Sequence, residues 1–147
     1  MTEAVVVGVL VVVLSQYFLK LILEPIINFR RVLSDISHAL LSNQEIIGNA
    51  GGDDKELTRK IHELSARLRS TVYLVPFYSF WCAIRVFALP KRQDIVEASH
   101  ELIKLGYGVK PIGTRTQSEQ AARNENSLSR LTELLRIDTK YIETEKP

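Results

Sequence analysis

The sequence predicts an all-α fold, with an N-terminal transmembrane helix followed by a small cytoplasmic helical bundle that forms oligomers. Three observations lead to this fold class. The apolar residues are concentrated at the N-terminus, those that follow recur at helical spacing, and no segment alternates as a strand does. With 147 residues, the chain is long enough for one modest domain.

Residues 4–23 predict the transmembrane helix. This segment, AVVVGVLVVVLSQYFLKLIL, has twenty residues and one charge, Lys20. At about 1.5 Å per residue it is about 30 Å long, which is the thickness of the hydrocarbon core of a bilayer. A cleaved signal peptide would need a basic start and a small-residue cleavage site, and neither is present. We therefore predict an uncleaved anchor within a first region at residues 1–25.

The charges that flank the apolar run predict its orientation. Glu3 and the terminal amine precede the run, whereas Lys20, Arg30 and Arg31 lie at its end or follow it. Because basic residues favour the cytoplasmic side, we expect the N-terminus outside and the rest of the chain in the cytoplasm. The single cysteine, Cys82, suits that reducing compartment.

The cytoplasmic region, residues 26–108, is predicted to be helical. Apolar side chains recur at helical spacing at Phe29, Leu33, Ile36 and Leu40, and again at Leu57, Ile61, Leu64 and Leu68. Between these two helices, the sequence GNAGGDD predicts a loop from Gly48 to Asp54, with Asp54 as an N-cap. Pro25 is expected to allow a kink before the first helix, and Pro76 to interrupt whatever helix follows the second.

Two further helices are predicted in the second half of the chain. One begins near Lys91 and ends at Leu105, with Gly106 as its C-terminal stop. The polar region at residues 109–147 is expected to form a C-terminal helix and a frayed tail. Docking on the bundle or on a neighbouring subunit is expected from three leucines at heptad spacing, Leu128, Leu131 and Leu135.

The composition excludes several classes of function. Nineteen Lys and Arg against seventeen Asp and Glu give a net charge of +2, which is too small for general binding of duplex nucleic acid. One cysteine excludes a disulfide framework and a cysteine-based zinc site, and His62 and His100 lack partners at metal-ligand spacing. The sequence contains no phosphate loop, dinucleotide fingerprint or nucleophile elbow. We therefore expect no enzyme activity, no metal and no cofactor.

Polar residues at four-residue spacing form a stripe at the end of the predicted anchor, at Gln16, Lys20, Glu24 and Asn28. In one interpretation the anchor ends here, and Lys20 extends to the lipid headgroups. In the other, several copies assemble and turn the stripe toward a water-filled lumen, since ionisable residues in membrane segments often mark ion pathways. The four residues are therefore candidates for a pore lining.

The segment at residues 70–93 is predicted to lie next to the membrane. Its central part, YLVPFYSFWCAIRVF, contains six of the eleven aromatic residues, and no acidic residue occurs between Glu63 and Asp94. Aromatic and basic residues together are typical of segments that lie in the lipid headgroup layer, and a short re-entrant hairpin is one variant of this placement. The same mixture could bind a single-stranded oligonucleotide by stacking and charge. It could also form a helical core with arginines at its edge. The candidates for contact with the membrane or an oligonucleotide are Arg67, Arg69, Tyr73, Trp81, Arg85, Lys91 and Arg92.

Arg31 and His38 form a different kind of candidate. The segment RVLSDISH that they enclose resembles the R-x(4–6)-H motif of helical HEPN ribonucleases. This resemblance implies that Arg and His from two subunits would polarise and protonate the RNA phosphate. The alternative is an ordinary surface arginine and a histidine that packs between helices.

Three segments carry a wider resemblance, FRRVLSDISHALL, ELSARLRSTVYLVPFY and LPKRQDIVEASHELIKLG. Over residues 4–108 the chain resembles a family of small bacterial membrane proteins with one N-terminal anchor and a compact cytoplasmic helical domain. In architecture it is also similar to membrane effectors of antiphage systems, namely the Hailong channel subunit and the pore-forming accessory protein of some CRISPR systems. These resemblances imply a single pass through the bacterial inner membrane, self-assembly and depolarisation of the cell.

Together these features favour a channel or pore subunit that assembles with itself and is gated through its cytoplasmic helices. A membrane-anchored scaffold that docks a cytoplasmic partner is the alternative, and a membrane-tethered HEPN-type ribonuclease is a further one. The expected partners are the lipid bilayer and other copies of the chain. A nucleotide, an oligonucleotide or a cytoplasmic protein is the expected trigger.

Overall fold

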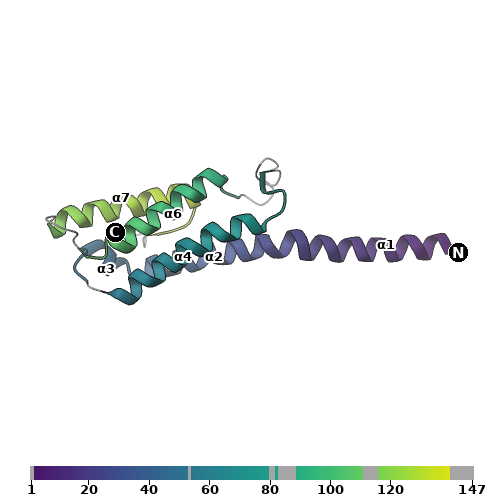
Figure 1. Cartoon of the computed structure of the whole chain (residues 1–147), viewed down its shortest axis with the longest axis horizontal. Helices are drawn as coiled ribbons and strands as arrows, with labels where there is room; N and C mark the ends of the chain where they lie inside the picture. The colour runs from purple at the N-terminus through teal and green to yellow at the C-terminus, as the bar shows by residue number, and fades with distance from the viewer. Residues whose placement is uncertain (1, 53, 80–81, 83–88, 111–115, 140–147) are drawn as a thin grey trace, which may run out of the picture.

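The computed structural model describes residues 2–52, 54–79, 82, 89–110 and 116–139. These residues form helices joined by turns, without a strand among them, so the all-α fold class is confirmed for this part of the chain. Figure 1 shows one long helix that begins at the N-terminus and runs into a bundle, where shorter helices lie beside its second half.

The long helix comprises α1 (Thr2–Phe18), the π-helical turn η1 (Leu19–Leu23) and α2 (Glu24–Ser42). It is continuous over 40 residues, and its N-terminal part is long and apolar enough to cross a membrane. At about 1.5 Å per residue these 40 residues extend over about 60 Å. The valines and leucines of α1 expose between 44% and 65% of their surface, because no other described helix except η1 contacts α1 closely.

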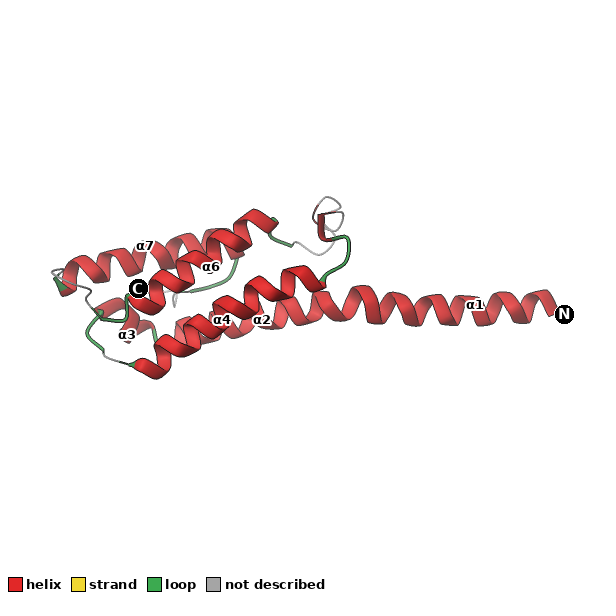
Figure 2. Cartoon of the chain, in the orientation of Figure 1, coloured by secondary structure: helices red, strands yellow, loops and turns green. Residues whose placement is uncertain are grey.

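Pro25 does not kink this helix, so the expectation from the sequence was wrong. A proline lacks the N–H group for a helical hydrogen bond, and its ring clashes with the carbonyl group four residues earlier. In the π-helical turn before Pro25, the N–H group of Glu24 donates to the carbonyl oxygen of Leu19, five residues back. This wider turn accommodates the proline ring, and α1 and α2 continue nearly in line (Figure 2).

The bundle consists of α2, α3 (Gln44–Asn49), α4 (Lys55–Leu74), α6 (Arg92–Tyr107) and α7 (Gln117–Leu135). Helix α4 packs against α2 and α6, and α7 packs against α6 and α3. The apolar positions predicted on α2 and α4 face one shared core. All of them are buried except Leu33, which is half-buried at the edge of that core.

The predicted N-cap of α4 is confirmed, and α4 ends just before Pro76. The side chain of Asp54 accepts hydrogen bonds from the N–H groups of Glu56 (3.0 Å) and Leu57 (2.9 Å), so Asp54 is the N-cap of α4. Helix α4 ends at Leu74, and Pro76 lies just beyond it, as expected for a residue that cannot continue a helix.

Two glycines that were predicted outside helices lie within them instead. Helix α2 already ends at Ser42, and Gly48 belongs to α3, which the chain leaves at Ala50 with a left-handed φ of 46°. Gly106 lies inside α6, whose C-cap is Gly108. The reason for a glycine at 106 is packing, because a Cβ atom there would lie 2.6 Å from Nε2 of His62.

Helix α7 docks on the bundle of its own chain. Leu128, Leu131 and Leu135 are all buried in the shared core. Its first turn is closed by a capping box in which the Thr116 hydroxyl accepts from the Glu119 N–H group and the Glu119 carboxylate accepts from the Thr116 N–H group. The last residues of the predicted frayed tail, 140–147, lie outside the described residues.

Candidate functional site

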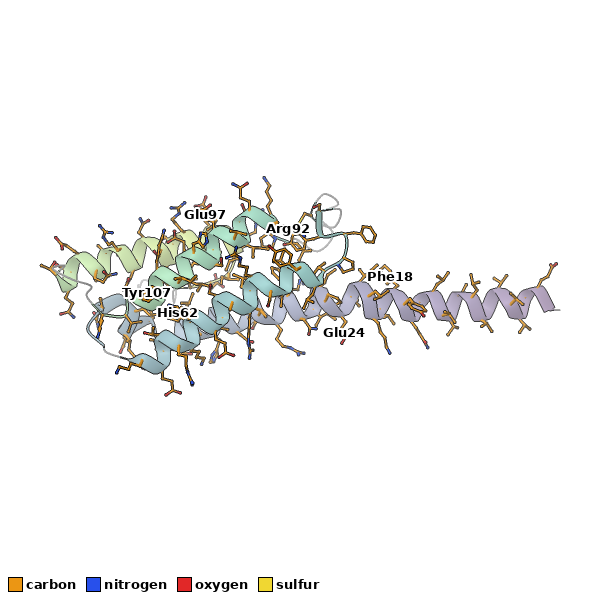
Figure 3. The ribbon with its side chains drawn as sticks, in the orientation of Figure 1. Phe18, Glu24, His62, Arg92, Glu97 and Tyr107 are labelled. Atoms are coloured by element: carbon orange, nitrogen blue, oxygen red, sulfur yellow. The ribbon has the colours of Figure 1, made fainter. Side chains whose placement is uncertain are left out.

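The predicted polar stripe lies along an exposed line of the long helix. Gln16 is in α1, Lys20 in η1, and Glu24 and Asn28 in α2, and all four side chains are exposed. Helix α2 turns other side chains, such as Phe29, toward the core. The bundle therefore does not cover the stripe, and Figure 3 shows Glu24 projecting from the helix close to where the bundle begins.

A second exposed group lies at the end of the bundle next to α1. Tyr73 and Leu74 end α4, Phe77 follows them, and these side chains expose 67%, 65% and 79% of their surface. Helix α4 runs back along α2, so its last turn returns to the place where the bundle meets α1 (Figure 1). The φ of Phe77 is 53°, a value that is uncommon for a bulky residue. We call these three side chains the apolar tip. Exposed apolar side chains at one end of a domain form a candidate contact surface.

Arg92 lies against two aromatic rings beside the apolar tip. Its guanidinium carbon is 5.5 Å from the centroid of the Tyr73 ring and 5.8 Å from that of Tyr78. Tyr78 is buried, packs edge-on against Phe29 at 6.3 Å, and donates its hydroxyl to the Pro90 carbonyl oxygen at 2.5 Å. Burial raises the pKa of the Tyr78 hydroxyl, so it remains a neutral donor. The cation is thus held at a defined place at this end of the bundle.

The other candidates of the aromatic and basic segment are less tightly grouped. Arg67 pairs with Glu63 on its own helix at 2.8 Å, with both side chains more than half exposed. Arg69 is exposed on α4, and Lys91 is exposed as the N-cap of α6. Trp81 and Arg85 lie outside the described residues. The structure therefore brings Tyr73 and Arg92 together and leaves Arg67, Arg69 and Lys91 as separate surface residues.

Arg31 and His38, the pair that resembles a ribonuclease motif, are both exposed on α2. His38 is therefore not a histidine that packs between helices. Seven residues correspond to about two helical turns, so the two side chains share one side of α2 at a spacing of about 10 Å along the axis. One chain alone does not bring them into contact, which is compatible with a pair completed by a second copy.

A groove between α6 and α7 was not found from the sequence. Its volume is about 450 Å³, and the side chains that shape it are Glu101, Lys104, Tyr107, Gln120, Arg123 and Arg130. These residues come from two segments that are separated in the sequence, and none of them forms a motif. Only the pairing of α6 with α7 reveals that they share a surface.

Glu101 is the buried charge of this α6–α7 groove, with 3% of its surface exposed. Its carboxylate accepts hydrogen bonds from Lys104 Nζ at 2.7 Å and Ser127 Oγ at 2.8 Å, and Arg130 Nη1 lies 3.9 Å away. Burial alone would raise the pKa of Glu101, but these hydrogen bonds and the two positive charges lower it. Glu101 is therefore a permanent negative charge at neutral pH.

Asn124 ties the three elements around the groove together. Its Nδ2 atom donates to the carbonyl oxygens of Ile47 and Gly108, both at 2.7 Å, and its Oδ1 atom accepts from Gln120 Nε2 at 3.1 Å. Asn124 is 2% exposed. Since both carbonyl groups accept only, they fix the orientation of the Asn124 amide.

Comparison of the chain with protein-family models, with curated proteins and with solved structures gave no match. The resemblance to antiphage channel effectors thus remains a hypothesis from layout. Among the described residues, no three His, Cys, Asp or Glu side chains are grouped so that they could hold a metal ion.

Proposed function

We propose that the chain is a subunit of a membrane channel or pore, anchored by α1 and gated through a cytoplasmic bundle. The observation that carries this proposal is the line Gln16, Lys20, Glu24 and Asn28, exposed along an unbroken helix. Polar side chains at the end of a membrane span are satisfied by water or by protein rather than by lipid tails. One helix cannot enclose an aqueous path, whereas a ring of copies that turns this line inward can.

The charges of the stripe fit the inner mouth of such a pore. The segment Val5–Leu14 is apolar on all sides and covers about half of the hydrocarbon core, so the stripe begins within the span and continues past its cytoplasmic end. Lys20 and Glu24 are one helical turn apart. Rings of these two residues carry opposite charges, so each ring offsets part of the repulsion within the other.

The connection between the bundle and the span supports gating. Helices α1 and α2 are joined through η1 without a loop, so a rotation of the bundle is transmitted along the helix to the stripe. The turn η1 lies inside the stripe and precedes Pro25, where one helical hydrogen bond is missing. Single π-helical turns are frequent at functional positions in helices. The weakest point of the long helix thus coincides with the proposed inner mouth.

The apolar tip supports a position of the bundle directly on the cytoplasmic leaflet. Tyr73, Leu74 and Phe77 would enter the headgroup layer, and Arg92 would lie near the lipid phosphates. The orientation is tested with reporters fused after Pro147. A cytoplasmic reporter is expected to be active there and a periplasmic reporter inactive, and the opposite result would place the bundle outside.

A membrane-anchored scaffold is the second candidate. It is favoured by the core of the bundle, because residues from α2 to α7 form one buried cluster within a single chain. The bundle therefore needs no second copy to bury its apolar faces. The two candidates differ in oligomeric state, since a closed ring in detergent supports the channel and a monomer supports the scaffold.

The decisive experiment compares reversal potentials in a planar bilayer under a salt gradient. Lys20→Glu leaves two stacked acidic rings, so we expect a shift toward cation passage. Lys60→Glu makes the same charge change at an exposed position of α4 and should leave the reversal potential unchanged. Absence of conductance from correctly inserted and assembled wild type would end the channel proposal. Equal reversal potentials of wild type and Lys20→Glu would remove Lys20 from the lumen.

A further inference from the structure

We infer that the α6–α7 groove binds a small phosphorylated ligand that carries a flat ring, of the size of a nucleoside monophosphate. The volume of about 450 Å³ lies in the range of small-molecule sites. The inference rests on the charges, the floor and the aromatic wall of the groove. It concerns the bundle alone and holds whether or not the anchor forms a pore.

Among the described residues, one cation of the groove has no ion-pair partner. Arg130 pairs with Glu97 and lies near Glu101, and Lys104 pairs with Glu101. Arg123 lines the same groove, and it makes no ion pair among the residues that the structure describes. The groove thus has three cations and one carboxylate, Glu101, in its lining, and Glu97 pairs with Arg130 from outside the lining. Arg123 can donate a charge-assisted hydrogen bond to a phosphate group.

Gln120 lines the groove and has a buried amide oxygen to which no described group donates a hydrogen bond. Gln120 is 4% exposed, and its Nε2 atom donates to Asn124 Oδ1. The two carbonyl partners of Asn124 fix the orientation of its amide, and the Asn124 Oδ1 atom in turn fixes which end of the Gln120 amide is the donor. The other end, Gln120 Oε1, is an acceptor to which no described group donates. A buried acceptor without a hydrogen bond lowers the stability of the folded protein, and a ligand that donates to it removes this penalty. A small shift of the Gln120 side chain toward the groove would let a ring amine supply that donor, whereas phosphate alone lacks the ring.

Tyr107 forms an aromatic wall beside these polar groups. Its ring packs against His62 with centroids 4.7 Å apart, and yet 59% of the residue is exposed (Figure 3). His62 is held in turn by close contact with Gly106. A tyrosine ring that is held by a tilted contact with a neighbouring ring and is more than half exposed is a suitable platform for stacking with a flat ring.

The position of the groove favours a soluble ligand over a lipid headgroup. Helix α6 begins at Arg92, beside the apolar tip, and ends at Tyr107 at the opposite end of the bundle (Figure 3). The 15 steps from Arg92 to Tyr107 correspond to about 22 Å along the helix. The aromatic wall therefore lies away from α1, where a ligand from solution has access.

Calorimetric titration of the full chain in detergent micelles tests the inference with three probes, namely AMP, adenosine and inorganic phosphate. We expect AMP to bind more tightly than either of the other two. Arg123→Gln and Tyr107→Leu should each weaken AMP binding at least about tenfold, the first by loss of a charged contact and the second by loss of stacking. Tyr107→Phe keeps the ring, and Lys60→Gln removes a charge outside the groove, so both should bind AMP as wild type does.

Several results would overturn the inference. The first is a lack of AMP binding by a wild-type protein that unfolds cooperatively on heating. The second is equal affinity of wild type and Arg123→Gln, which alters an exposed side chain and is expected to fold. Equal affinity for AMP and inorganic phosphate would exclude the ring contact. Equal losses in Tyr107→Phe and Tyr107→Leu would exclude stacking as its cause.

Discussion

Helix α1 and the helices of the bundle have the same backbone conformation for different physical reasons. In α1 the valines and leucines expose 44% to 65% of their surface, whereas Phe29, Leu102 and Leu131 in the bundle expose at most 1%. The bundle helices are stabilised by burying one apolar face. The valines of α1 pack against no other described helix except η1, and β-branched residues weaken a helix in water. In hydrocarbon the backbone has no other hydrogen-bond partner, so the helix becomes the stable form.

The largest expected effect comes from the same substitution, Leu→Ala, made once in the bundle and once in α1. Leu102 is 1% exposed in α6, which lies between α4 and α7. We expect Leu102→Ala to lower the free energy of unfolding of the bundle by about 2–5 kcal/mol, since it leaves a cavity. Leu10→Ala removes the same atoms from a residue that is 57% exposed, and should not change that quantity. The measurement is thermal unfolding in detergent followed by circular dichroism.

A similar loss in both variants would contradict the comparison. It would show that α1 packs against the bundle or against another copy through Leu10. The oligomeric state of Leu10→Ala, measured in the same detergent, then distinguishes these two explanations. An unchanged bundle with a changed oligomeric state would locate the contact between copies in α1.

The sequence predicted those parts of the fold that depend on local patterns. The spacing of Leu57, Ile61, Leu64 and Leu68 was sufficient for α4, because an amphipathic helix buries its apolar face wherever it packs. Asp54 was predictable as an N-cap for the same reason, since capping involves only the next three residues. The polar stripe is also local, because the long helix alone determines its four-residue spacing.

The remaining features depend on contacts between distant residues. The α6–α7 groove needs the pairing of Glu101 with Ser127 and Arg130, and no spacing rule brings those residues together. Gly106 is suited to the end of a helix by residue type, but its contact with His62 of α4 gives it another role. The wide turn before Pro25 is a backbone adjustment that the residue types do not specify.

A second prediction uses glycine in both regions and has a smaller expected effect. A Cβ atom at Gly106 would lie 2.6 Å from His62 Nε2, so Gly106→Ala forces the histidine to move at a cost of about 1–3 kcal/mol. Alanine also favours the helix by about 0.5–1 kcal/mol. The net result is a bundle destabilised by about 1 kcal/mol, measured as a lower Tm.

The controls for this prediction are glycines that have open space around them. Apart from the adjacent residues and the backbone of its own helix, a Cβ atom at Gly8 or Gly48 would have no described atom within 4 Å. Gly48→Ala in α3 should raise the stability of the bundle by up to about 1 kcal/mol, whereas Gly8→Ala in α1 should leave it unchanged. If Gly106→Ala is as stable as Gly48→Ala, the close contact with His62 is not a constraint.

The smallest expected effect concerns pH and compares a buried carboxylate with an exposed one. The pKa of Glu101 lies below its ordinary value of 4.5, because its hydrogen bonds and neighbouring cations outweigh burial. A lowered pKa stabilises the folded state above the unfolded value, and this contribution is lost as the pH falls through the folded value. We expect Glu101→Gln to lower the free energy of unfolding by about 1 kcal/mol at pH 7 and by less near pH 4.

The control is Glu63→Gln, which breaks a pair whose side chains are 57% and 58% exposed, so it should change the free energy of unfolding by at most about 0.5 kcal/mol. The measurement is Tm at both pH values, and a constant gap between wild type and Glu101→Gln would mean that the carboxylate contributes through its shape and not its charge.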